Sequence, residues 1–127
     1  MAKMILIIDD DPDFAEAVST LLESNGYETA YAENGETGLG KAVSIRPDCI
    51  LLDVMMTTKT EGFDLSRKLQ DDQTTKDIPV ILVTGIRRDM NIPYSFEPDK
   101  DWLPVRAVIE KPIRPETLLK TIAEQIG

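Results

Sequence analysis

Histidine is missing from the 127-residue sequence, and cysteine occurs once, at Cys49. Without histidine the chain lacks the commonest general base and the commonest zinc ligand of proteins. With one cysteine it can form no internal disulfide, which suits a reducing cytoplasm. No apolar run is long enough to cross a bilayer, and the first residues lead directly into a short apolar segment. We therefore expect a cytoplasmic protein with neither a membrane insertion nor a secretory signal.

Basic residues are also scarce, with 14 Lys and Arg against 23 Asp and Glu, a net charge of -9. Nucleic-acid binding depends on neutralising phosphates, so we expect no direct nucleic-acid binding and a DNA-directed role only through another chain. The hydrophobic fraction of 42% and charged fraction of 29% are typical of a globular protein. The length fits one domain, expected over 1–127 with no output domain.

Two hydrophobic periodicities alternate along the chain. Short apolar runs, rich in branched residues, predict strands at 4–8, 27–32, 49–52, 79–83 and 107–109. Helical spacing between them predicts helices that begin at Pro12, near Gly62 and at Pro115. Leu39, Ala42 and Val43 mark a further helix, which ends before Pro47. Strands and helices in alternation predict an α/β fold with a parallel sheet covered on both faces.

The segment 85–106 interrupts this alternation. If the alternation continued, this segment would hold a further helix, but Pro93, Pro98 and Pro104 would each break a helix interior. We expect an irregular or shortened fourth helix, then a loop whose apolar residues, Trp102 among them, dock against the body.

Polar side chains stand where the predicted strands end. Asp9 and Asp10 follow the first strand, Asp53 the third, Thr84 the fourth and Lys111 the fifth. The carboxyl ends of parallel strands share one edge of a sheet, and this edge is where such sheets bind ligands. Two carboxylates about 5 Å apart repel by roughly 3 kcal/mol at an effective dielectric of ~20. A hard divalent cation relieves that repulsion, so we expect Mg²⁺ there.

The motifs "ILIIDDDP", "DCILLDVMM", "IPVILVTG" and "IEKPIRPETLL" together resemble the response-regulator receiver domain (CheY-like) of bacterial two-component signalling. The resemblance covers nearly the whole chain except 85–106. It implies a three-layer, doubly wound, flavodoxin-like fold with five parallel strands in the order 2-1-3-4-5. It also implies a cytoplasmic phosphorelay protein with two kinds of partner, a sensor histidine kinase or phosphotransfer protein and a downstream protein target.

The resemblance also implies a role for each site residue. Asp53 would be the phosphoacceptor, and it would ligate Mg²⁺ together with Asp10 and the backbone carbonyl of Met55. Asp9 would hold the ion through water. The Thr84 hydroxyl and the Lys111 ammonium would each contact a phosphoryl oxygen.

Three departures from the family concern the readout and the lifetime of the phosphoryl group. Val108 replaces a common aromatic residue, and 85–106 replaces part of the usual signalling face, so the oligomeric state, monomer or weak dimer, stays open. Met55 and Ile86 cannot orient a hydrolytic water, which predicts a long-lived phosphoaspartate.

Simpler interpretations stand beside these. Asp11 is a helix cap, and Cys49 is a small buried core residue. Two other functions compete with this one. One is a pseudo-receiver adaptor that is never phosphorylated. The other is an aspartate-based phosphatase, which would want a second acid where Val54 and Met55 stand.

Overall fold

The computed structural model of the chain describes residues 2–53, 61–84, 107–110 and 113–126. Within these ranges the strands are β1 (Met4–Ile8), β2 (Glu28–Ala32), β3 (Cys49–Asp53), β4 (Val80–Thr84) and β5 (Ala107–Glu110). The helices are α1 (Pro12–Ser24), α2 (Gly35–Ile45), α3 (Glu61–Asp71) and α4 (Pro115–Ile126). The elements follow the order predicted from the sequence, and the predicted bounds agree with the observed ones to within two residues.

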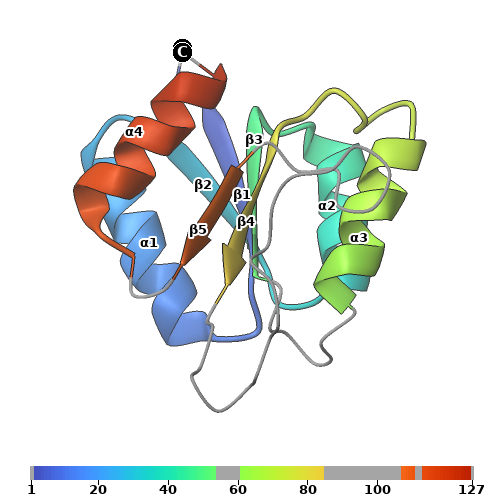
Figure 1. Cartoon of the computed structure of the whole chain (residues 1–127), viewed down its shortest axis with the longest axis horizontal. Coiled ribbons are helices and arrows are strands. Elements are labelled where there is room, and N and C mark those ends of the chain that lie inside the picture. Colours follow the sequence, from blue (N-terminus) through green and yellow to red (C-terminus); the bar gives the residue numbers. More distant parts are fainter. Residues whose placement is uncertain (1, 54–60, 85–106, 111–112, 127) are drawn as a thin grey trace.

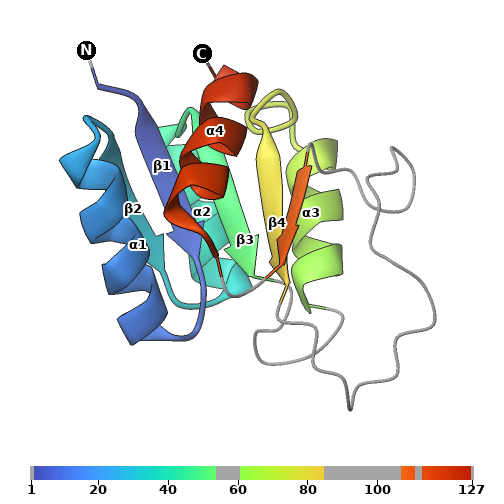
Figure 2. The same ribbon diagram turned by 60° about the vertical axis from the view of Figure 1, so that its left-hand side comes forward.

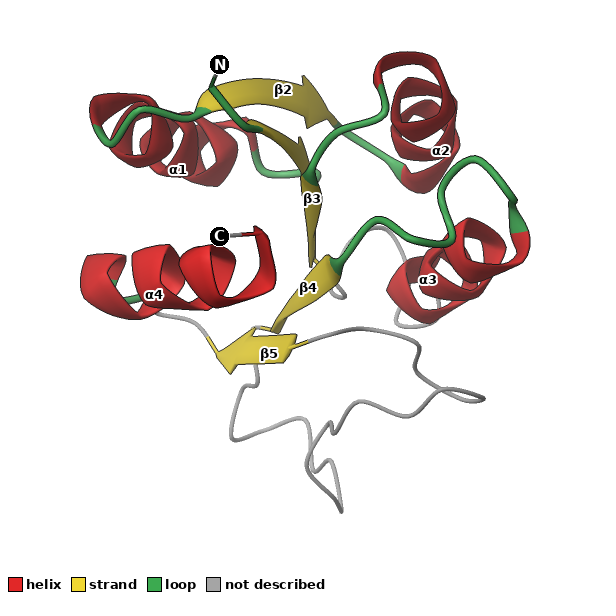
Figure 3. Cartoon of the chain, turned by 90° about the horizontal axis from the view of Figure 1, so that it is seen from above, coloured by secondary structure: helices red, strands yellow, loops and turns green. Residues whose placement is uncertain are grey.

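The five strands form one parallel sheet in the order β2-β1-β3-β4-β5. Helices α1 and α4 cover one face and α2 and α3 cover the other (Figures 1 and 3). This arrangement confirms the three-layer, doubly wound fold that the resemblance implied. The strand directions are clearest in Figure 2, where the arrowheads of the sheet point to one edge.

Successive residues of the central strands pack on opposite faces of the sheet. Leu6 and Ile8 of β1 belong to the cluster beneath α2 and α3, whereas Ile5 and Ile7 belong to the cluster beneath α1 and α4. Strand β3 is buried over its whole length. Burial on both faces explains why these strands appear in the sequence as continuous apolar runs.

The helix beginnings follow local sequence signals. Asp11 caps α1, because its Oδ1 accepts hydrogen bonds from the backbone N–H groups of Asp13 (3.0 Å) and Phe14 (3.3 Å). Asn34 caps α2 in the same way through the N–H of Thr37, at 2.8 Å. The predicted capping role of Asp11 is therefore confirmed, as is the burial of Cys49.

Val43 lies on α2 but is 38% exposed, so only Leu39 and Ala42 of the three residues that predicted this helix face the core. Segment 85–106, with its expected irregular helix and Trp102, lies outside the described residues. Among the helices that are described, none combines the length and the apolar character needed to span a membrane.

Candidate functional site: an acidic cluster at the sheet edge

The site stands where the order of the strands reverses. Strand β1 lies between β2 and β3, and Ile8 at the end of β1 is in register with Ala32 on one side and Leu52 on the other. Asp9 and Asp53 are the residues that follow Ile8 and Leu52. The pairing of these two strands therefore brings both carboxylates to the same point of the sheet edge, the position where doubly wound sheets hold their ligands.

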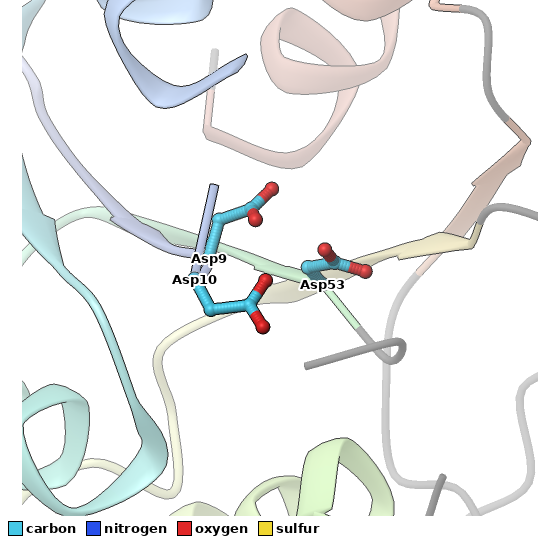
Figure 4. Close-up of side chains that lie close together, drawn as sticks. All are labelled: Asp9, Asp10 and Asp53. Atoms are coloured by element: carbon cyan, nitrogen blue, oxygen red, sulfur yellow. The ribbon is translucent and has the colours of Figure 1, made fainter. Parts of the chain in front are cut away.

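Asp9, Asp10 and Asp53 form one cluster at that point. One carboxylate oxygen from each residue lies within 4.8 Å of the others (Figure 4). Asp9 is 1% exposed and Asp53 is 4% exposed, whereas Asp10 is exposed to solvent. The cluster thus has a buried floor and an open side through which a small ion or a phosphoryl group can enter.

The burial of the cluster determines what it can bind. Carboxylates removed from water and placed close together repel strongly, and a bound cation offsets both the repulsion and the desolvation. Three oxygen donors with room for water are a ligand set for a hard divalent cation that keeps part of its hydration shell. The donor set and the geometry therefore fit Mg²⁺.

Backbone hydrogen bonds fix the Asp9 carboxylate and its main chain. Asp9 Oδ1 accepts from the Asp11 N–H at 2.8 Å, and the Asp9 N–H donates to the Ala32 carbonyl at 3.0 Å. Asp11 in turn caps α1, so the turn that carries the cluster is continuous with the start of that helix. The positive end of the helix dipole lies beside the carboxylates and offsets part of their charge.

The negative potential of the cluster reaches the neighbouring strand. Burial raises the pKa of the Tyr31 phenol on β2, and the nearby carboxylates, Asp9 foremost and then Glu33 and Asp10, raise it further. An approaching cation therefore meets a negative field that is wider than the three ligands alone.

The remaining predicted residues are described only in part. Thr84 is the last residue of β4, in register with Glu110 of β5, so its backbone stands at the carboxyl end of the sheet. The side chain of Thr84 lies outside the described part of the structure, as do Met55 and Lys111. Their roles stay predictions from the sequence.

The comparisons with known proteins agree with this geometry. The family model of the response regulator receiver domain matches residues 5–123. The chain belongs to this family. It is 39% identical over 121 residues to Protein PilH from Pseudomonas aeruginosa, covering 93% of each chain. It is also 39% identical over 97 residues to the DNA-binding dual master transcriptional regulator RpaA from Synechocystis, with 76% of this chain matched to 40% of RpaA.

A solved structure of the chemotaxis protein CheY4 from Vibrio cholerae superimposes on the receiver with a TM-score of 0.81, at 27% identity, covering 98% of this chain and 99% of that one. The receiver thus spans nearly all of PilH and CheY4 but less than half of RpaA.

One residue beside the site was not singled out from the sequence. Gly38 of α2 packs against Ile8, directly before Asp9. Nothing in the spacing of the sequence marks this contact, because a glycine within a helical pattern predicts only a weaker helix.

Proposed function

We propose that the chain, as a single receiver domain, takes a phosphoryl group from a phosphohistidine of a sensor histidine kinase or phosphotransfer protein onto Asp53, and then changes its affinity for a downstream protein. The supporting observation is the cluster of Asp9, Asp10 and Asp53 in a chain of this family. An acidic cluster with a buried floor suits phosphoryl transfer because positioning and charge stabilisation supply most of the catalysis of that reaction.

In the proposed reaction an oxygen of the Asp53 carboxylate attacks the phosphorus atom. The bond between phosphorus and the donor imidazole breaks, its electron pair returns to the imidazole nitrogen, and an acyl phosphate forms on Asp53. The Thr84 hydroxyl donates a hydrogen bond to one phosphoryl oxygen and the Lys111 ammonium pairs with another.

Asp9, Asp10 and Asp53 would hold Mg²⁺, with the Met55 carbonyl as a further ligand. When bound, Mg²⁺ supplies positive charge that neutralises the carboxylates and the incoming phosphoryl oxygens. Asp9 and Asp53 also keep the floor of the site buried, so these charges interact with little screening by water.

The net charge of -9 supports an output through a protein partner. RpaA is a DNA-binding regulator by its name, but the match covers 40% of it, and the charge of the receiver opposes contact with phosphates. We propose that this receiver does not itself bind nucleic acid.

The test is mass spectrometry after incubation with acetyl phosphate, with and without Mg²⁺. The wild-type chain should gain one phosphoryl group only when Mg²⁺ is present, and Asp53→Asn should gain none. Asp48→Asn is the matched control, because Asp48 precedes the same strand at its opposite end, and this variant should be modified like the wild type.

Two results would contradict the proposal. A wild-type chain that gains no phosphoryl group would favour the pseudo-receiver adaptor, and release of many equivalents of phosphate per chain would favour a phosphatase. The rate at which the phosphorylated chain loses its phosphoryl group also tests the roles of Met55 and Ile86. Loss over many minutes fits the long-lived phosphoaspartate, whereas loss within seconds would refute that prediction.

A further inference from the structure

Gly38 makes an unusually close approach to the end of β1. A Cβ atom placed on Gly38 would lie 2.6 Å from Ile8 Cδ1, 3.0 Å from Ile8 Cγ1 and 3.1 Å from Ile8 Cγ2. Gly40, on the same helix, has nothing within 4 Å of such an atom. Only the first of these two glycines is therefore required by packing.

The Ile8 side chain has little freedom to move away from an added methyl group. It is fully buried, and it packs in one cluster with Ala32, Ala42 and Leu52. Branching at its Cβ atom restricts rotation about χ1, and two of the three close atoms are bonded directly to that Cβ. A side chain on residue 38 would therefore move the backbone of β1 or of α2.

Helix α2 packs on the sheet over about two turns. Gly35, Gly38 and Ala42 are all buried along one side of it. A rigid shift of α2 away from the sheet would open packing at Gly35 and at Ala42, so part of the displacement falls on Ile8. Protein cores transmit such shifts because they are close-packed.

Any displacement of Ile8 reaches the acidic cluster directly. Asp9 follows Ile8 in the chain, and Leu52, the register partner of Ile8, precedes Asp53. The Asp9 N–H also donates a hydrogen bond to the carbonyl of Ala32, the other register partner of Ile8. One contact between a helix and a strand thus lies beneath both buried carboxylates.

We infer that Gly38 is a positioning residue for the metal site. Because it carries no side chain, the Ile8 side chain fills the space between α2 and β1, and this contact holds Asp9 and Asp53 at the separation that the cation requires. Gly38 and Ile8 act as a pair, since a larger residue at one position calls for a smaller residue at the other. The inference rests on the Mg²⁺ binding proposed above.

Calorimetric titration with Mg²⁺ tests the pair in four variants of the full chain. Gly38→Ala should weaken Mg²⁺ binding about tenfold, the lower end of what disturbed supporting groups cost a metal site. Gly40→Ala, the matched control on the same helix, should bind like the wild type. Ile8→Val removes the atom that lies 2.6 Å away, so Ile8→Val combined with Gly38→Ala should bind within about twofold of Ile8→Val alone.

A second readout needs no metal. In the NMR spectrum of the metal-free protein, the Asp11 amide reports the Asp9 carboxylate, because its N–H donates to Asp9 Oδ1. Its chemical shift should move in Gly38→Ala, stay in place in Gly40→Ala and return towards that of Ile8→Val in the double variant. A role confined to general packing would leave this resonance and the Mg²⁺ affinity unchanged.

The possible outcomes separate the two proposals. A wild-type chain that binds no Mg²⁺ contradicts the proposed function. A wild-type chain that binds Mg²⁺, with Gly38→Ala binding equally well, contradicts only the role of Gly38.

Should Gly38→Ala fail to fold, the Mg²⁺ affinity of Ile8→Val is compared with that of Ile50→Val. The second variant makes the same change in the same hydrophobic cluster, but further from the carboxyl edge of the sheet. Weaker binding in Ile8→Val than in Ile50→Val supports the inference, and equal binding overturns it.

Discussion

The two edges of the sheet use aspartate in opposite ways. At the amino edge Asp48 pairs with backbone groups: its Oδ2 accepts from the Met4 N–H and its own N–H donates to the Met4 carbonyl, both at 2.8 Å. At the carboxyl edge, Asp9, Asp10 and Asp53 gather within 4.8 Å. A single carboxylate paired with a backbone donor joins two strand beginnings and stabilises the fold. A crowded group of carboxylates opposes folding unless a cation is bound, so its arrangement is explained by function.

Among the variants that test this contrast, Asp9→Asn should cause the largest change in Mg²⁺ affinity and in stability. The change removes one charge from the cluster but keeps an oxygen that can accept from the Asp11 N–H. A dication and a carboxylate about 5 Å apart attract by roughly 7 kcal/mol at an effective dielectric of ~20. Desolvation of the two charges offsets much of this attraction, so Mg²⁺ affinity should fall by about a hundredfold or more. The metal-free protein should become more stable, by about 1 kcal/mol or more, because a repulsion is removed.

Calorimetric titration with Mg²⁺ and urea unfolding without metal measure these two changes. Lower stability of metal-free Asp9→Asn would show that the carboxylate is structural, and the contrast between the two edges would fail.

Asp48→Ala should give the reverse result, with a smaller effect. The Met4 N–H loses its acceptor at the start of β1, and an unsatisfied donor at a half-buried site costs about 1–2 kcal/mol. The Mg²⁺ affinity should stay at the wild-type value, because Asp48 lies at the opposite end of β3 from Asp53. Urea unfolding and calorimetric titration test both parts, and a weakened affinity for Mg²⁺ would contradict the separation of roles.

The contrast between the edges could be predicted from the sequence only at its carboxyl side. Parallel strands with acidic residues at their ends place Asp9, Asp10 and Asp53 at one edge of the sheet. The strand order that the family resemblance implied then puts the first and third strands side by side, as observed. The pairing of Asp48 with Met4 depends on how the start of β3 is placed against β1, and a single aspartate before a strand does not signal it. The bounds of β1, β3 and β4 were predicted well because burial on both faces leaves continuous apolar runs.

Distances between packed side chains could not be predicted from periodicity. A helical pattern gives the face that α2 turns to the sheet, but not how closely the helix approaches, so the contact of Gly38 with Ile8 was not foreseen. Arg46 ends α2 at a φ of 48°, a left-handed conformation that glycine usually supplies. Here the following Pro47 marked the helix end, and the residue in the cap gave no signal of its own.

The smallest expected effect concerns Cys49, the first residue of β3. It is a change in stability that appears only at alkaline pH. Burial raises the pKa of its thiol from 9.0 to about 12, opposed by a backbone hydrogen bond and assisted by the charge of Asp48. The folded chain therefore keeps the thiol proton in a range where the unfolded chain has lost it. The stability that this contributes is complete below pH 9 and is lost as the pH rises towards 12.

Between pH 9 and pH 10 the loss should be roughly 1 kcal/mol. Urea unfolding at several pH values measures it, with Cys49→Ala as the comparison. The variant is less stable at neutral pH because it leaves a small cavity, but its stability should fall less steeply above pH 9, since other titrating groups are shared by both chains. Equal slopes in the two chains would mean that the thiol titrates as freely in the folded protein as in the unfolded one. That result would mean that solvent reaches Cys49 at the amino edge of the folded sheet. It would contradict the contrast between this buried edge and the solvent-exposed side of the acidic cluster.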